Sequence, residues 1–510
     1  MSEQKTYDFI IVGSGVAGLT SGILLAKEGH SVLILEKNHQ VGGALQVFSR
    51  DKRIFDTGVH YLGSMDEGEN LHRIFNYLGV FDHISFKPME LNGFDHVRFA
   101  DGYEGRLANG YTRFKEQLVA DFPEESEAID RFIQKISDTI QKYPLYLLKD
   151  EQTYDSQAQE HLTNETAWEV MQSIFKSQRI IHVILGNAMI YAGDYKRTPF
   201  FVVALVLNSY IKGSYRLPGG GGLLTKALVK ELRNHGGELL KHKEVDQLHV
   251  VNGSVESVHC KDGSTYFGKN IISNLHPSMT IKLAGVENFK PAYRHRLEKL
   301  KNTISSFSVF LTLEKGKIPY FNFNRYELYT ENPFDTIDYK INEWPNYLMV
   351  STASHAGESD YAESITILTY MNAEEVEEWA DTFNTVPIPS DREADYHSWK
   401  KEKERLVLER FYERYPEVRE HVIGTYTSTP LTYRDYLGTP EGELYGIEKN
   451  VAAVASSSMN TRTKVSNLYL TGQNIVLHGI LGSCIGALLT TFNFVDRNEL
   501  LKKINQGYEL

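Results

Sequence analysis

The first 36 residues carry an apolar pattern that predicts strand, helix and strand in succession. Residues 9–12 (FIIV) form an apolar run of the kind found in strands that are buried on both faces. Over residues 16–28 the apolar positions recur at helical spacing, and Gly29 is placed to end that helix. Residues 32–35 (VLIL) are a second run of strand length. We therefore expect the chain to open with a strand–helix–strand unit of a parallel sheet.

Helical and strand-like patterns alternate along the rest of the chain. An apolar stripe predicts helix over residues 113–143, with Pro123 at a helix start, and a long charged helix is expected over residues 391–415, before Pro416. Shorter helices are expected over residues 71–80, 223–234 and 479–492. Strands are expected within residues 94–107 and over residues 238–240, 247–251, 255–259, 271–272, 307–313, 347–351 and 365–370.

The turn between the first strand and the first helix has the spacing of a dinucleotide-binding loop. Residues 13–18 read GSGVAG, in which Gly13 permits a tight turn and Gly15 lets the backbone approach a pyrophosphate. Gly18 lets the helix and the strand pack closely. The helix N-terminus, with Val16 and Ala17 in its first turn, favours negative charge. The loop therefore predicts the phosphate site of a dinucleotide.

A carboxylate follows the second strand at the position where a ribose is expected. Glu36 stands eighteen positions after Gly18, can accept hydrogen bonds from both ribose hydroxyls and disfavours a 2′-phosphate; Lys37 follows it directly. Gly42 and Gly43 come six residues after Glu36, a spacing similar to that of FAD-binding members of the glutathione-reductase-like superfamily. That resemblance implies FAD rather than NAD.

Three further blocks resemble retinol saturases and carotenoid isomerases. FDTGVHYLG at 55–63 is similar to the segment that carries the chain past the flavin, and LPGGGG at 217–222 is similar to the start of the return to the FAD domain. By that likeness Val245 lies near the adenine through its backbone. LYLTGQN at 468–474 is similar to the last strand and turn, which implies Gly472 and Gln473 beside the flavin phosphates or ribityl chain. Gly479 then opens a helix whose N-terminus points at the isoalloxazine.

The resemblance covers nearly the whole chain, and the segments at 428–433 and 442–446 share it with the retinol saturase branch in particular. Residues 478–483 depart from the HPGGG-like pattern of bacterial phytoene desaturases, which favours a saturase or an isomerase. One alternative for the four glycines at 219–222 is a flexible hinge, because no buried strand is predicted before them.

The resemblance implies an α/β fold with a discontinuous, glutathione-reductase-like FAD-binding Rossmann domain. This domain is expected at 1–95, 215–290 and 450–510 and interleaves with an α+β substrate-binding domain at 96–214 and 291–449. We see no second glycine-loop unit for NAD(P)H, so the electron donor or acceptor is undefined.

The totals exclude several classes of protein. A chain of 510 residues can bury a large cofactor, and a net charge of −12 without a long basic run argues against nucleic acid as a partner. The two cysteines are far apart in sequence, which argues against a disulfide framework, and we predict no metal site. The first strand begins too early to leave room for a secretory signal, so we expect a cytoplasmic protein.

Membrane contact is expected from one side at most, because no stretch reaches the roughly 18 apolar residues of a spanning helix. The apolar segments at 180–190 and 200–211 are candidates for an interfacial patch or for the wall of a substrate tunnel, and ordinary core helix is the favoured interpretation.

The function implied by the resemblance is that of an FAD-dependent oxidoreductase. It would act on conjugated C=C bonds of an apolar polyene, a carotenoid or retinoid-like lipid, by saturation, cis/trans isomerisation or desaturation. The alternatives are an amine-oxidase-like or other lipid flavin oxidoreductase and a non-catalytic binding protein of the Rab GDP dissociation inhibitor type; the intact glycine loop with Glu36 argues against the latter. His60 and His478 are the candidate catalytic residues, as proton donors near the flavin, and packed structural histidines are the alternative for both. Tyr61 and Tyr433 are further candidates.

Overall fold

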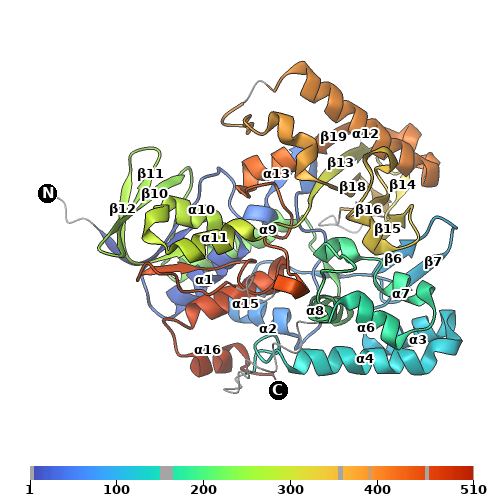
Figure 1. Ribbon diagram of the computed structural model, residues 1–510, viewed down its shortest axis with the longest axis horizontal. Helices are drawn as coiled ribbons and strands as arrows, with labels where there is room; N and C mark the ends of the chain where they lie inside the picture. Colours follow the sequence, from blue (N-terminus) through green and yellow to red (C-terminus); the bar gives the residue numbers. More distant parts are fainter. Residues whose placement is uncertain (1–4, 150–164, 354–359, 390–391, 454–458, 509–510) are drawn as a thin grey trace.

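The computed structural model describes residues 5–149, 165–353, 360–389, 392–453 and 459–508. Two large sheets organise these residues, one at each side of the molecule in Figure 1. The chain passes between the two sheets several times, so each is assembled from segments that are far apart in sequence.

The first sheet has a parallel core in which β1 lies between β12 and β2. Strand β20 pairs with the far side of β12, and β9 pairs with β2. The antiparallel strands β10 and β11 extend the sheet from the N-terminal part of β12. Its strands are β1 (Thr6–Val12), β2 (Val32–Leu35), β9 (Glu238–Leu240), β10 (Val245–Val251), β11 (Ser254–Cys260), β12 (Thr265–Ser273) and β20 (Leu468–Leu470).

Helices flank this sheet as the sequence pattern predicts. Helix α1 (Val16–Lys27) follows β1 directly, and Gly29 beyond its end has φ +85°. Almost the whole of α1 is buried, because it packs between the sheet, α9 (Gly221–Asn234) and α15 (Gly479–Thr491). The α/β fold with a Rossmann-type unit is therefore confirmed.

The second sheet has the order β19-β13-β18-β16-β15-β6-β7, in which only the β6–β15 pairing is parallel. The inner strands β13, β18 and β16 are buried along their full length, as expected for strands covered on both faces. The strands are β6 (Asp95–Arg98), β7 (Glu104–Leu107), β13 (Ser305–Leu313), β15 (Asn324–Leu328), β16 (Tyr347–Thr352), β18 (Ser364–Met371) and β19 (Val422–Ser428).

Short strand pairs and the remaining helices complete the described part of the chain. The pairs are β3 (Val47–Arg50) with β4 (Arg53–Asp56), β5 (Lys87–Pro88) with β8 (Tyr215–Arg216), and β14 (Ile318–Pro319) with β17 (Tyr361–Ala362). The helices are α2 (Asn70–Leu78), α3 (Tyr111–Asp121), α4 (Ser126–Gln141), α6 (Ala167–Ile174), α7 (Gln178–Ile184), α8 (Phe200–Ile211), α10 (Pro277–Leu283), α11 (Pro291–Lys299), α12 (Ala394–Arg414), α13 (Pro430–Leu437) and α16 (Arg497–Ile504).

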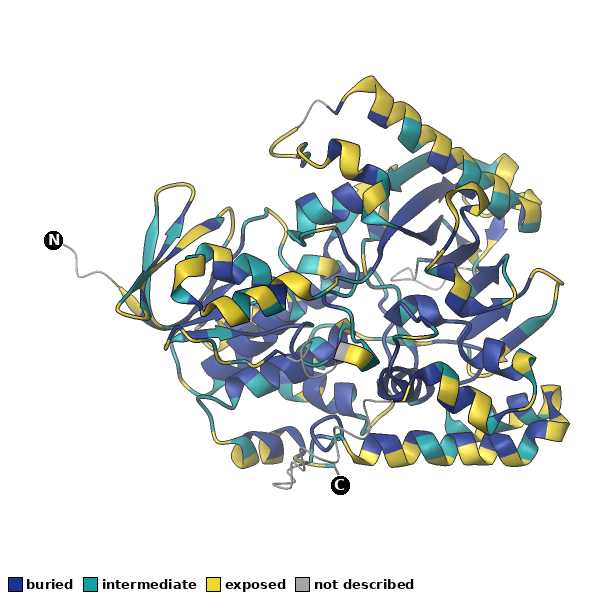
Figure 2. Cartoon of the chain, viewed as in Figure 1, coloured by how far each residue is buried: buried dark blue, intermediate teal, exposed yellow. Residues whose placement is uncertain are grey.

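Most of the predicted elements are confirmed. The long charged helix is α12, which displays an exposed outer face at the top of the molecule (Figure 2), whereas Asp391 lies outside the described residues. Residues 113–143 divide into α3 and α4 at Pro123. The glycine run at 219–222 begins α9, and the Gly221 N–H donates to the Asp56 carboxylate over 2.6 Å. This contact favours a packed helix start over a hinge.

The apolar helix α8 lies in the interior, where it is seen almost end-on in Figure 2. Every residue of α8 except Tyr210 is buried, so the alternative of an interfacial patch at 200–211 is wrong. Within the described residues no helix combines the length and the apolar character needed to cross a bilayer.

Candidate functional site: the dinucleotide cleft and the cavity beside it

The parallel strands of the first sheet end together at one edge. Val12 at the end of β1 is in register with Leu35 of β2 and with Ser273 of β12, and Ser273 is in register with Leu470 of β20. The segments that follow these four strands therefore meet outside their carboxyl ends, which is where open α/β sheets bind ligands. They are the loop at 13–18, Glu36, Asn274 and the turn at 471–474.

The glycine loop has the conformation that its sequence predicts. Gly13 has φ +94°, a left-handed conformation that favours glycine. A Cβ atom on Gly18 would collide with the Gly13 carbonyl oxygen, so the close approach of helix and strand requires glycine there. Gly15 is the N-cap of α1 and offers no side chain to the first turn, whose Val16 and Ala17 N–H groups have no partner within the helix.

The loop at 42–43 packs against the glycine loop. A Cβ atom on Gly43, which has φ +58°, would lie 3.2 Å from the Gly15 Cα. The Gly42 N–H donates to the Ser14 hydroxyl over 3.2 Å. Gly42 itself has φ +116°, and a side chain there would collide with Thr225 of α9. The structure therefore brings Gly42 and Gly43 against the glycine loop at 13–18.

Glu36 is buried and ties the end of β2 to the glycine loop. Its Oε2 accepts hydrogen bonds from the backbone N–H of Ser14, over 3.1 Å, and from the Ser14 hydroxyl. Its Oε1 accepts from the Asn38 N–H over 2.8 Å. Because each carboxylate oxygen has two acceptor positions, Oε1 keeps one position for a ribose hydroxyl.

Of the two other residues predicted near the adenosine, Val245 lies close to Glu36 and the Lys37 side chain points elsewhere. The Glu36 carbonyl accepts from the Lys243 N–H over 2.8 Å, so Val245 at the start of β10 follows closely in the same segment. The Lys37 side chain turns towards α13 instead, where Nζ donates to the Asp435 carbonyl over 3.2 Å. Burial lowers the pKa of Lys37. The Lys37 ammonium group therefore points away from the carboxyl edge of the sheet, where a dinucleotide is expected.

The C-terminal turn completes this edge. Gly472 has φ +106°, and a Cβ atom on it would lie 2.7 Å from the Asn274 amide. Gln473 is half-buried beside it, and α15 begins at Gly479, which is exposed. Thus the predicted contacts from both ends of the chain, apart from the Lys37 ammonium group, lie along the carboxyl edge of one sheet.

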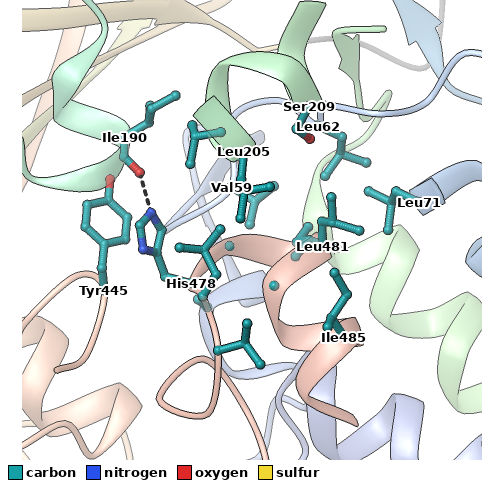
Figure 3. A pocket seen from close by; sticks show the side chains of 18 of the residues that line it. Val59, Leu62, Leu71, Ile190, Leu205, Ser209, Tyr445, His478, Leu481 and Ile485 are labelled. Atoms are coloured by element: carbon teal, nitrogen blue, oxygen red, sulfur yellow. Dashed lines mark hydrogen bonds between the residues drawn. The ribbon is translucent and has the colours of Figure 1, made fainter. Parts of the chain in front are cut away.

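A large apolar cavity adjoins the cleft. It encloses about 1740 Å³ of empty space, counting its opening, and lies between α8 and α15 (Figure 3). At one end it is lined by the exposed small residues Ala44, Gly58 and Gly479, and a Cβ atom on Gly58 would lie 3.1 Å from the Ala44 Cβ. These side-chain-poor surfaces next to Gly43 fit a planar ring, so the donor set and the space suit FAD.

The rest of the cavity wall is almost wholly apolar or aromatic. Leu205 and Ser209 of α8 face Leu481 and Ile485 of α15 across it, and Val206 also lines it. None of the described residues that line the cavity is an aspartate or a glutamate.

Both candidate histidines line this cavity. The His478 ring points away from α15 towards Ile190, whose carbonyl accepts from Nε2 over 2.9 Å, and lies 4.5 Å from the Tyr445 ring centroid (Figure 3). His60 has a buried Nε2 without a hydrogen-bond partner among the described residues. Burial lowers the pKa of both to about 4, so each is a neutral imidazole at neutral pH. Any proton donation by them would start from a neutral N–H group.

These two pKa shifts predict acid lability. A histidine with a pKa of about 4 when folded and about 6.5 when unfolded binds more protons in the unfolded chain between those values, so stability is lost as the pH falls. We expect His478→Phe, which keeps a ring against Tyr445, to lose less unfolding free energy between pH 7 and pH 5 than the wild type does. The difference should be about 2 kcal/mol by chemical denaturation. Equal losses in both proteins would contradict a buried neutral His478.

A polar network behind the cavity wall was not predicted. Asp95 accepts hydrogen bonds from Tyr61 (3.0 Å), Asn187 (3.0 Å) and Asn324 (2.8 Å), and the hydroxyls of Tyr61 and Tyr326 lie 2.8 Å apart. Burial raises the pKa of Asp95 to about 6. The network holds Tyr61 in the cavity wall. The sequence does not reveal this network, because its residues on β6, on β15 and at position 61 come together only in the folded chain.

A buried arginine fixes the segment that carries His60. The Arg216 guanidinium donates to the His60 carbonyl over 3.1 Å and to the Phe323 carbonyl over 2.7 Å. Burial lowers the pKa of Arg216.

Tyr433, the other tyrosine candidate, lines the cavity, and its hydroxyl lies 3.0 Å from the Ser308 hydroxyl. In the described residues no group of His, Cys, Asp and Glu is arranged to hold a metal ion.

Comparisons with known proteins agree with this geometry. Residues 11–78 match the family model described as NAD(P)-binding Rossmann-like domain. All-trans-retinol 13,14-reductase of Danio rerio is 25% identical, over 98% of this chain and 89% of that protein. Prolycopene isomerase 1 of an Oncidium hybrid cultivar, a chloroplastic protein, is 25% identical over 93% of this chain and 81% of that protein. The solved structure of putrescine oxidase bound to putrescine is 13% identical and has a TM-score of 0.64, with 96% of this chain and 99% of that chain covered, and it shows the same fold.

The fold, the cleft and these relatives define an FAD-dependent oxidoreductase with a discontinuous Rossmann domain and an interleaved α+β domain. Within that class the chain is similar over nearly its whole length to a retinol reductase and a carotenoid isomerase, in agreement with the resemblance that its motifs show.

Proposed function

We propose that the protein uses FAD to act on conjugated C=C bonds of an apolar polyene, a carotenoid or retinoid-like lipid, by saturation, cis/trans isomerisation or desaturation. The observation that carries this proposal is the cavity between α8 and α15, which begins at the small residues beside the glycine loop and continues as an apolar channel. Bound FAD would supply hydride or electron transfer at that end of the cavity.

The chain's own residues bind and orient the substrate in this proposal. Leucine and isoleucine side chains from α8 and α15 exclude water, so a polyene would lie along the channel with its conjugated bonds near Gly58 and Gly479. Neutral His478 is held by Ile190 and Tyr445 and donates its Nε2–H to the Ile190 carbonyl, so its Nδ1 is left as an unprotonated acceptor. We assign it to positioning or proton exchange at that atom.

The absence of carboxylates from the described lining disfavours amine substrates, because a protonated amine entering an apolar cavity would lose its hydration without a partner. The domain limits at 95, 215, 290 and 450, a cytoplasmic location and one-sided membrane contact remain predictions. One-sided membrane contact would give such a protein access to a lipid substrate.

The test is to purify the protein, measure absorbance near 450 nm, and identify lipids extracted from it by mass spectrometry. The reduced and the oxidised enzyme are then incubated anaerobically with a carotenoid, a retinoid and a diamine, and products are separated by chromatography. A saturated, isomerised or desaturated polyene supports the proposal. Faster flavin reduction by the diamine than any change in a polyene would replace it with the amine-oxidase-like alternative, and a colourless protein that binds lipid would favour a binding protein.

A further inference from the structure

Asn274 stands at the centre of the cleft without an assigned role. It follows β12 directly, and its backbone N–H donates to the Val12 carbonyl over 2.9 Å, which fixes it at the carboxyl edge of the sheet. Its side-chain amide is enclosed by glycines from two loops: a Cβ atom would lie 2.8 Å away on Gly15, 3.1 Å away on Gly18 and 2.7 Å away on Gly472. These three glycines therefore leave room for an amide as well as for a phosphate.

The amide satisfies part of the N-terminus of α1. In the orientation that suits its neighbours, the Asn274 side-chain oxygen accepts from the Gly15 N–H over 3.3 Å and from the Gly18 N–H over 3.2 Å. The first four N–H groups of a helix have no partner within it. Two of the four, those of Val16 and Ala17, are then left for a ligand, while the amide nitrogen faces Gly472.

We propose that Asn274 is a positioning residue for the FAD pyrophosphate, which its side chain directs to the Val16 and Ala17 N–H groups by occupying those of Gly15 and Gly18. This inference rests on the proposed function in taking FAD as the ligand. It requires a neutral side chain, because the amide lies within the space that the pyrophosphate approaches. It also explains why the turn that ends β20 needs glycine at 472.

Asparagine provides both an acceptor for the Gly15 and Gly18 N–H groups and a neutral side chain, whereas aspartate would provide only the acceptor. A carboxylate of the same shape would accept from the same two N–H groups, and more strongly, but would place a negative charge beside the pyrophosphate. Alanine would remove the acceptor and leave all four N–H groups to solvent or ligand. The two substitutions therefore separate a role in holding the loop from a role in receiving the phosphates.

The experiment compares Asn274→Asp, Asn274→Ala and the control Asn270→Asp, which alters the same strand at a residue whose amide donates to the Asp8 carbonyl. Deflavinated proteins are titrated with FAD by fluorescence at pH 8.0 and pH 5.5, and the thermal unfolding midpoint of each apoprotein is measured. At pH 8.0 we expect Asn274→Asp to weaken FAD binding at least about thirtyfold while its apoprotein midpoint stays at or above that of the wild type. Asn274→Ala should weaken binding about tenfold with a lower midpoint, and Asn270→Asp should bind as the wild type does.

The pH dependence of FAD affinity distinguishes this role from a purely structural one, which would give the same loss of affinity at both pH values. Protonation of the introduced carboxyl at pH 5.5 should restore part of the affinity of Asn274→Asp, whereas Asn274→Ala should show no such recovery. Wild-type affinity in Asn274→Asp at pH 8.0, or a deficit that does not respond to pH, overturns the inference alone. Failure of the wild-type apoprotein to bind FAD overturns the proposed function together with it.

Discussion

Gly15→Val is expected to purify without flavin, with FAD affinity lowered at least about a hundredfold. A Cβ atom on Gly15 would already lie 2.8 Å from the Asn274 amide, and the branched side chain would extend over the Val16 and Ala17 N–H groups. The backbone can no longer approach a pyrophosphate closely, so the hydrogen bonds at the start of α1 are lost together. Absorbance at 450 nm of the purified variant and titration of the apoprotein with FAD provide the measurement.

The control for this variant lies at the other end of the same helix. Gly29→Asn keeps a residue that tolerates the left-handed φ of +85°, and no other atom lies within 4 Å of a Cβ atom placed there. It should bind FAD as the wild type does. Full flavin occupancy in Gly15→Val would show that the dinucleotide does not lie against this loop.

Leu205→Asp is expected to lower turnover of a polyene at least about a hundredfold while the flavin spectrum stays unchanged. Leu205 is 2% exposed and lines the cavity, and its carbonyl accepts a hydrogen bond from Tyr146 over 2.9 Å, so its side chain cannot turn away without disturbing α8. A polyene that fills the cavity would have to strip water from the new carboxylate, at a cost of several kcal/mol.

The magnitude of this effect can be compared with the binding energy available. Burying roughly 400 Å² of polyene contributes on the order of 10 kcal/mol before the cost of immobilisation is subtracted, so the loss removes a large part of the net affinity. Leu205→Met conserves the volume and should retain activity, and Val203→Ala changes a buried residue of the same helix that does not line the cavity. Wild-type kcat/KM for a polyene in Leu205→Asp would exclude this channel as the substrate site.

The local elements of this protein follow from its sequence because their causes are local. The run at 9–12, the glycines at 13, 15 and 18 and the acid at 36 each act on their neighbours, and the structure places all of them in one loop and one sheet. Helix α8 shows the limit of such reasoning. Its all-round apolar composition predicts burial equally well for a core helix and for a tunnel wall, and only its packing opposite α15 shows that it is a core helix with one side on a cavity.

The residues that sequence reasoning missed act across long separations in the chain. Asp95 is recognisable only once Asn187, Asn324 and Tyr61 surround it, and Arg216 only once its guanidinium reaches two carbonyls. Asn274 had a usable signal, since a polar residue directly after a strand of the parallel sheet lies at its ligand-binding edge. That signal depends on knowing that β12 is the neighbour of β1.

The position of β20 and α15 in the chain determines when the site can form during synthesis on the ribosome. Strand β1 and the glycine loop emerge first, but the turn at 471–474 and the helix that packs against α1 are made only after more than 450 further residues. Until then the face of α1 that packs against α15, and the side of α8 that lines the cavity opposite α15, lack their partner helix. The C-terminal side of the site can therefore be completed only after α15 has left the exit tunnel.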